Sequence, residues 1–188
     1  MIEGFSKQFI KIYNNIDEYP LNFVLGLSGG VDSTALLILL KDFIQIYPSI
    51  NINIYPVIID HGLRSNSSSE ANAVKEMAQS LGFNPTIKRI IQKQNIGNIQ
   101  NWARIARRDL LYQSAFSLSA NLLLAHHYDD QVETVFMRLI RGSGIEGLLG
   151  MKDLHFWRGI FVIRPLLNFK KEDLIKYVKL NKVIFFQD

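Results

Sequence analysis

Residues 21–40, LNFVLGLSGGVDSTALLILL, constrain the fold more than any other stretch of this chain. A run of β-forming residues ends at Ser28, two glycines follow, and an apolar run with helical spacing begins after Asp32. Glycine allows positive φ angles and lets a backbone approach another group closely. The pattern therefore predicts a strand over residues 22–27, a glycine turn, and a helix from about Asp32 to Tyr47.

The rest of the chain repeats this alternation of strand and helix. Several predicted strands are nearly continuous apolar runs, which is typical of parallel strands covered on both faces. We therefore predict an α/β fold: a doubly wound, mostly parallel sheet with helices on both faces, which binds ligands at the carboxyl ends of its strands. The other strands are predicted at residues 51–60, 86–91, 121–125, 160–163 and 183–186, and the other helices at 1–16, 67–81, 101–119, 129–140 and 170–180.

Composition limits the classes of protein that fit. The chain has 188 residues, 48% hydrophobic and 20% charged, which suits one globular domain with a sizeable core. It has no cysteine, which excludes disulfides, thiolate metal sites and cysteine nucleophiles within these residues. A net charge of +4 permits a nucleic-acid partner without requiring one. With no leader and no apolar run long enough to span a bilayer, we expect a cytoplasmic protein without membrane contact.

The glycine turn has the chemistry of an anion site. The N–H groups of Gly29 and Gly30 can form a nest with the first helical turn, and Ser28 and Ser33 add hydroxyls. The turn lacks the lysine of the G-x-x-x-x-G-K-[ST] loop and is not G-x-G-x-x-G. Asp32 can be a helix cap. Next to phosphates, however, it would need a bridging cation such as Mg²⁺, which prefers carboxylate and phosphate oxygens.

The full string SGGVDS resembles the S-G-G-x-D-S signature of the PP-loop ATP pyrophosphatases. That family cleaves ATP between the α and β phosphates and adenylates its substrate. The resemblance implies that Asp32 helps to hold the Mg²⁺ that neutralises the leaving pyrophosphate. It also implies that ATP is bound by the whole turn: Ser28, Gly29, Gly30, Val31, Asp32 and Ser33.

Four further strings resemble the tRNA(Ile)-lysidine synthase family, and the likeness extends from Val24 to Asp188. That family uses ATP to join L-lysine to the wobble cytidine of tRNA(Ile) with the anticodon CAU. The resemblance implies a ligase that forms a carbon–nitrogen bond through an adenylated tRNA intermediate, and it leaves a homodimer open. The strings are DHGLRSNSSSEA (60–71), WARIARR (102–108), LAHHYDDQVETVFMRLIRGSGIEGLLGM (124–151) and IRPLL (163–167).

Two departures from the family pattern affect these expectations. The arginine motif usually ends in an aromatic residue, where this chain has Arg108. Family members also run on beyond the final FFQD, into a further loop and often into RNA-binding domains. We therefore expect residues 1–188 to be a single PP-loop catalytic domain, the N-terminal part of a longer protein whose C-terminal RNA-binding domains are absent here.

Acidic and histidine residues follow the fourth predicted strand. Asp130 and Glu133 share one helix face at i, i+3, where an acidic first turn would already stabilise the helix dipole. The resemblance implies that they recognise the lysine cation, and either could accept its proton. We expect His126 to contact ATP or the attacking amine and His127 to be only a neighbour. Zinc is rejected because His126, Asp129 and Asp130 lack a fourth ligand.

Two groups of arginines are candidates for phosphate contacts. Arg104 and Arg107 lie within one predicted helix, where a solvated face is the ordinary outcome. Because guanidinium groups bind phosphates well, we expect both to contact the tRNA backbone or ATP. Arg138 and Arg141, with the glycine loop at 142–144, are expected to hold the anticodon arm.

Three alternatives remain open from the sequence. Trp102 is either a platform on which a base stacks or an ordinary core residue. The chain could be a nucleotide-binding sensor, although a sensor would need neither the acidic pair nor the arginine helix. It could also be a PP-loop ligase acting on a small molecule, although the absence of cysteine disfavours thiolases that act through their own cysteines. A requirement for tRNA in ATP–pyrophosphate exchange would separate these functions.

Overall fold

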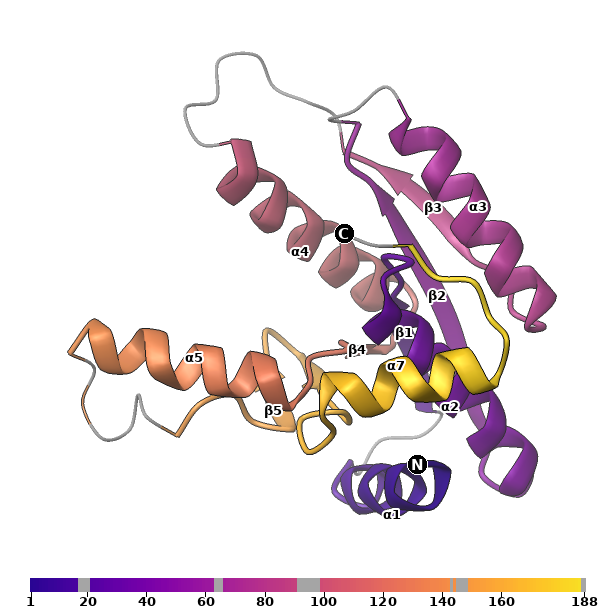
Figure 1. Ribbon diagram of the computed structural model, residues 1–188, viewed down its shortest axis with the longest axis horizontal. Helices are drawn as coiled ribbons and strands as arrows, with labels where there is room; N and C mark the ends of the chain where they lie inside the picture. Colours follow the sequence, from indigo (N-terminus) through magenta and orange to yellow (C-terminus); the bar gives the residue numbers. More distant parts are fainter. Residues whose placement is uncertain (17–20, 63–65, 91–98, 143, 145–148, 187–188) are drawn as a thin grey trace.

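The computed structural model describes residues 1–16, 21–62, 66–90, 99–142, 144 and 149–186 (Figure 1). These residues form a six-stranded sheet of order β3-β2-β1-β4-β6-β5. All neighbouring pairs are parallel except β5 with β6, so the predicted mostly parallel sheet is confirmed. The strands are β1 (Leu21–Gly26), β2 (Ile52–Asp60), β3 (Thr86–Arg89), β4 (Asn121–Leu123), β5 (Leu154–Trp157) and β6 (Ile160–Ile163).

The order of the strands reverses at β1. The chain passes from β1 to β2 and β3 on one side and then returns to place β4 on the other side. In doubly wound sheets, ligands bind beyond the carboxyl ends of the strands at such a reversal. The residues after β1 and β4 therefore lie at the position where this fold binds ligands.

Helices cover both faces of the sheet, as predicted. Along β1, Phe23 and Leu25 enter a large core with α1, α2, α3 and α7, whereas Val24 enters a second core with α4. None of the described helices has the length and hydropathy that crossing a membrane requires. The helices are α1 (Ile2–Tyr13), α2 (Val31–Ile46), α3 (Ser67–Ser80), α4 (Ile99–Ser117), α5 (Tyr128–Ile140) and α7 (Lys171–Leu180).

Helix α2 is the most deeply buried helix of the fold. Ten of its residues are buried, including the continuous run from Ser33 to Leu40, because α1 and α7 cover the side that does not face the sheet. A helix that is apolar all round is typical of such a position. Tyr177 of α7 also donates a hydrogen bond to Asp42 of α2. The glycine turn at the start of α2 is thus anchored in the core.

Two strand predictions differ from the structure. The predicted strand at 183–186 is wrong: it is reduced to one bridge between Phe186 and Gly30, because its backbone meets the glycine turn instead of a strand. Strand β5 was not predicted. It pairs with β6 across a tight turn in which Arg158 and Gly159 have φ angles of 51° and 88°. Residue 91, the end of the strand predicted at 86–91, and residue 143 of the expected glycine loop lie outside the described residues.

Candidate functional site

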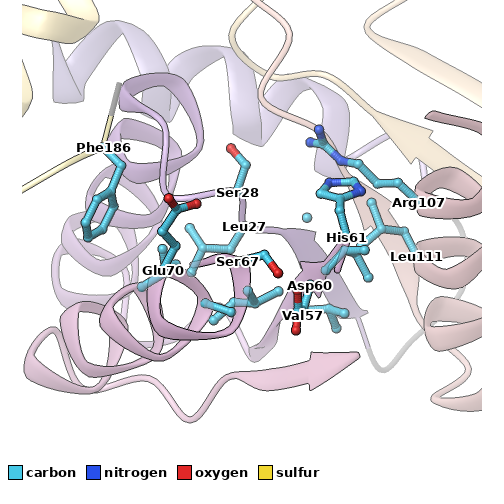
Figure 2. Close-up of a pocket in the computed structure, with 15 residues that line it drawn as sticks. Leu27, Ser28, Val57, Asp60, His61, Ser67, Glu70, Arg107, Leu111 and Phe186 are labelled. Atoms are coloured by element: carbon cyan, nitrogen blue, oxygen red, sulfur yellow. The ribbon is translucent and has the colours of Figure 1, made fainter. Parts of the chain in front are cut away.

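A cavity of about 390 Å³ opens at the carboxyl ends of β1 and β2 (Figure 2). Its lining includes the apolar side chains of Leu27, Val57 and Leu111. Figure 2 shows His61 and Arg107 on one side of the cavity, opposite Glu70 and Phe186. Ser28, the first residue of the glycine turn, lies between these two sides. The cavity therefore combines an apolar surface with polar groups from strand ends and from α3 and α4.

The glycine turn is held closed by its own serines. The backbone N–H of Ser28 donates to Ser33 Oγ at 3.2 Å, and Ser33 Oγ donates to the carbonyl of Gly30 at 3.1 Å. Gly29 has a φ of +85°, and a Cβ there would overlap Cγ2 of Val74 on α3. Val31 is buried in the core, so its side chain does not face the cavity. The turn thus requires glycine at position 29 and presents backbone N–H groups and hydroxyls.

Asp32 has the environment expected of a cation ligand. Its Oδ1 atom is buried and has no hydrogen-bond partner among the described residues. The nearest basic side chains are those of His127, with Nε2 at 3.5 Å from Oδ1, and Lys171, with Nζ at 3.9 Å from Oδ2. A buried carboxylate oxygen without a donor is costly unless a cation approaches it. Asp32 therefore fits the predicted Mg²⁺.

The remaining ligands of such an ion would not be protein side chains. Within the described ranges, no group of three or more histidine, cysteine, aspartate or glutamate residues could hold a metal ion. Mg²⁺ usually keeps several waters and binds through one or two carboxylates plus substrate phosphates. A site with Asp32 as its protein carboxylate therefore suits Mg²⁺ that arrives with a phosphate ligand.

The expectation that His127 is only a neighbour is wrong. His127 is 3% exposed and caps α5. Its ring Nδ1 accepts from the backbone N–H of Asp129 at 3.2 Å, and the backbone N–H of His127 donates to Asp130 Oδ2 at 2.9 Å. Its Nε2 lies 3.5 Å from Asp32 Oδ1 and 3.6 Å from Asp130 Oδ2. Burial lowers its pKa, but the carboxylates of Asp32, Asp130 and Asp129 outweigh burial and raise it. His127 thus connects the glycine turn with the acidic end of α5.

His126 has a different environment from its neighbour. Arg164, which follows β6, donates from Nε to His126 Nδ1 at 3.2 Å. Burial, with a smaller effect from the positive charge of Arg164, lowers the pKa of His126 to about 4. His126 is therefore neutral at pH 7 and is poorly suited to act as a general base.

The two acidic residues assigned to lysine are not equivalent. Asp130 is half-buried and already accepts the N–H of His127, whereas Glu133 is exposed one turn further along α5. The first turn of α5 is tied to the start of α7 by two backbone N–H groups. That of Tyr128 donates to the carbonyl of Phe169 and that of Lys171 donates to Asp129 Oδ2, both at 2.9 Å. Asp130 therefore shapes the site, and Glu133 is the carboxylate with free access to a ligand.

The predicted phosphate-binding arginines occupy different places. Arg107 lines the cavity and Arg104 is exposed on α4. Arg108 is exposed, and its guanidinium lies over the ring of Trp157 at 5.5 Å from the ring centre. Arg138 donates to the carbonyl of Gly150 at 2.9 Å. Figure 1 shows α5 extending away from the sheet, so Arg138 and Arg141, in its last turn and just after it, are not brought to the cavity.

The residues of this region that were not predicted as site residues include His61 and Glu70 of the cavity, and Asp60, Arg164 and Lys171. Asp60 accepts hydrogen bonds from Gly62 N–H at 2.9 Å and from Ser68 Oγ at 2.8 Å. Burial raises the pKa of Asp60, but these bonds and a hydrogen bond with the side chain of Ser67 outweigh burial and lower it. Arg164 and Lys171 reach the site from beyond β6. Asp60 and Arg164 stood in strings that carried the family resemblance, and Lys171 had no signal beyond a charged first helical turn.

A turn of this kind at the reversal of strand order defines a nucleotide-binding α/β domain, because its N–H groups suit phosphates and its carboxylate suits their cation. The comparison with protein families agrees with this class. A family model described as the PP-loop domain matches residues 1–188, and the chain belongs to that family.

The curated relatives share one name. A tRNA(Ile)-lysidine synthase of Wolbachia pipientis wMel is 39% identical over 182 residues, covering 96% of this chain and 42% of the relative. A protein of the same name from Orientia tsutsugamushi is 36% identical over 178 residues, covering 94% of this chain and 39% of the relative. The chain thus spans about two fifths of the length of the curated relatives it matches.

Solved structures support the fold alone. The U34-tRNA thiolase NcsA from Methanococcus maripaludis superposes with a TM-score of 0.80 at 20% identity, covering 99% of this chain and 65% of that one. An NAD⁺ synthetase from Burkholderia pseudomallei gives a TM-score of 0.56 at 10% identity, covering 95% of this chain and 74% of that one. The predicted doubly wound architecture is confirmed by these neighbours as well.

Proposed function

We propose that this chain catalyses the ATP-dependent joining of L-lysine to the wobble cytidine of tRNA(Ile) with the anticodon CAU. The observation that carries the proposal is the position of His127, whose Nε2 lies 3.5 Å from Asp32 and 3.6 Å from Asp130. The nucleotide half and the lysine half of the site are therefore adjacent. The names of the curated relatives support the same reaction.

The nucleotide half binds ATP in this account. The adenosine occupies the cavity beside the glycine turn, where Leu27 and Phe186 supply apolar surface. The triphosphate meets the N–H groups of Gly29 and Gly30 and the hydroxyls of Ser28 and Ser33. Asp32 would hold Mg²⁺, which would supply positive charge beside the pyrophosphate.

The first step adenylates the tRNA. The ring carbonyl oxygen of the cytosine attacks the α-phosphorus of ATP, the bond to the β-phosphate oxygen breaks, and pyrophosphate leaves with that electron pair. The residues of the turn contribute by holding the leaving group in line and by stabilising its charge. Arg107 at the cavity wall and Arg104 on the exposed side of α4 contribute phosphate contacts to ATP or the tRNA backbone.

The second step transfers lysine. Glu133 and Asp130 hold the ε-ammonium by charge-assisted hydrogen bonds, and one carboxylate or a water accepts its proton. The neutral amine attacks the activated ring carbon and the carbon–oxygen bond to AMP breaks. AMP leaves with that electron pair, so no covalent enzyme intermediate forms.

The test is incubation with ATP, labelled lysine and tRNA(Ile) carrying the CAU anticodon. The expected result is label on the wobble cytidine, with one AMP and one pyrophosphate released for each lysine transferred. A matched tRNA whose wobble base is changed should receive no label. Pyrophosphate release without tRNA would instead indicate a ligase for a small molecule. ATP binding without any pyrophosphate release would indicate a sensor.

A further inference from the structure

Arg164 is a partly buried cation that the two steps above do not use. Burial lowers its pKa, so its charge is incompletely solvated. Among the residues that the structure describes, no carboxylate lies within ion-pair distance of it. A buried charge without a counter-charge is unfavourable unless a ligand or another group compensates it. The position of Arg164 therefore requires an explanation.

The contacts of Arg164 leave part of its guanidinium available. Nε donates to His126 Nδ1 at 3.2 Å, and Nη1 donates to the carbonyl of Lys152 at 3.1 Å. A guanidinium carries five N–H donors in a planar fork, and these two bonds use the minority of them. The remaining donors are suited to a planar or tetrahedral anion such as a phosphate.

The bond from Arg164 also fixes the tautomer of His126. Since Nδ1 accepts a hydrogen bond, the proton of the neutral imidazole must be on Nε2. Burial lowers the pKa of His126 to about 4. The positive charges of Arg164, Arg107 and His127 also lower it, and Asp130 opposes them. His126 is therefore a neutral donor, held in one orientation by Arg164.

Both residues lie at the ligand-binding edge of the sheet. Arg164 directly follows β6, and His126 comes shortly after β4, its parallel neighbour. The pairing continues between them, because Leu124 N–H donates to the carbonyl of Ile163 at 2.9 Å. Arg107, whose charge acts on His126, also lines the cavity next to the glycine turn. The two donors thus lie at the same edge of the sheet as the cavity, outside the residues that line it.

We propose that Arg164 and His126 form a phosphate-binding pair, in which the guanidinium and the Nε2–H group bind one phosphate. The phosphate comes either from the nucleotide, as the α-phosphate of ATP or AMP, or from the tRNA backbone. This inference rests on the proposed function for the identity of these two sources. Arg164 acts both as a ligand of the phosphate and as the positioning residue for His126.

The experiment compares Arg164→Met with Arg158→Met. Arg158 is a matched control: it is an exposed arginine at the opposite end of β6, stacked on Trp157 at 4.6 Å. Binding of AMP and of an ATP analogue with a methylene between the α and β phosphates is measured by calorimetry, and tRNA binding by filter retention. We expect Arg164→Met to weaken the nucleotide ligands or the tRNA about tenfold to a hundredfold and Arg158→Met to leave them unchanged.

Conservative variants separate binding from a purely structural role. Arg164→Lys keeps the charge but loses the fork, so we expect it to recover only part of the affinity. His126→Gln keeps an N–H near the position of Nε2 and should bind phosphate better than His126→Ala. Imidazole ¹⁵N shifts should show the Nε2–H tautomer of His126 in the unchanged protein and a mixture of tautomers in Arg164→Met.

Three results would overturn the pair. The first is phosphate affinity in Arg164→Met equal to that in Arg158→Met, with only a lower melting temperature. The second is an Arg164→Met variant that binds phosphate normally and only needs more lysine for transfer, which would mean that Arg164 binds the lysine carboxylate. The third result applies if Arg164→Met does not fold: it is equal phosphate affinity in His126→Ala and His126→Gln. Failure of the unchanged protein to form lysidine, with these affinities behaving as expected, would remove the proposed function and leave the pair intact.

Discussion

Helix α2, which begins at the glycine turn, and helix α5, which carries the acidic pair, differ in how the fold holds them. Ten residues of α2 are buried, whereas no residue of α5 is. Phe136 and Ile140 of α5 are 61% and 66% exposed, although both are apolar. The proposed nucleotide half of the site is therefore part of the core, and the proposed lysine half is carried by a helix outside it.

The difference suggests separate roles for rigidity and access. The turn is closed by Ser28 and Ser33 and supported by α3 behind Gly29, so it is formed before any ligand binds. Helix α5 is held at its first turn by the cap of His127 and the bond from the backbone N–H of Lys171 to Asp129, and further along by side-chain bonds from Gln131 and Arg138 to the backbone at 150–151. Changes at the glycines of the turn should thus affect stability, a change at Asp32 should affect chemistry, and changes at Glu133 should affect one chemical step.

The largest expected effect tests the nucleotide half. Asp32→Asn should reduce Mg²⁺-dependent pyrophosphate release about a thousandfold, equivalent to ~4 kcal/mol, because the metal loses its carboxylate. The melting temperature should change little. Asp42→Asn on the same helix is the control, since it removes a carboxylate bonded to Tyr177 and should leave pyrophosphate release intact. Near-normal release by Asp32→Asn would reduce Asp32 to a helix cap.

The free energy of unfolding should fall more for a substitution at Gly29 in the turn than for one at a glycine elsewhere. Gly29→Ala should lower the free energy of unfolding by about 2–4 kcal/mol, combining positive-φ strain with overlap against Val74. Gly82→Ala is the matched control, with a φ of +90° and no atom within 4 Å of the new Cβ. It should cost only about 1 kcal/mol. Equal losses in urea unfolding would show that α3 does not support the turn.

The next effect concerns the lysine half. Glu133→Gln should raise the lysine concentration required for half-maximal transfer about tenfold to a hundredfold, because a charge-assisted hydrogen bond contributes about 1.5–3 kcal/mol. Adenylation of the tRNA should continue, and the melting temperature should not change. Glu76→Gln, an exposed glutamate on α3, should behave as the unchanged protein does. Loss of adenylation together with transfer would assign the acidic pair to ATP.

The smallest expected effect concerns tRNA. Arg104→Ala should weaken tRNA binding about threefold to tenfold and lower the salt slope of the affinity by about 1, as for one phosphate contact. Lys179→Ala, in the last turn of α7, removes an exposed charge and should change neither quantity. Filter binding at several salt concentrations measures both. Identical slopes in the two variants would leave Arg104 as part of a solvated helix face.

Much of the fold and part of the site could be predicted from local sequence. The alternation of apolar runs and the glycine turn determine β1, α2 and the parallel sheet, because each depends on residues close together in the chain. The strand prediction at 183–186 is wrong because it depended on a partner far away in the chain. Its composition suits a strand, but its partner is the glycine turn, which has no free strand edge to extend.

The residues that link the two halves could not be found in this way. His127 differs from His126 by one position, and only the fold shows that one histidine meets Asp32 while the other meets Arg164. Lys171 reaches Asp32 because α7 packs on α2. Such contacts depend on how distant elements pack, which the spacing of residues along the chain does not encode.

The separation of the two halves can be measured directly in one sample of the unchanged protein. The protein is mixed with tRNA(Ile) and ATP labelled at the α-phosphate, first without lysine and then with it. The account predicts that label accumulates on the tRNA as AMP before lysine is added, and that lysine then discharges the label as free AMP while it becomes attached to the wobble cytidine. No label on the tRNA in the absence of lysine, or label that lysine does not discharge, would contradict the account.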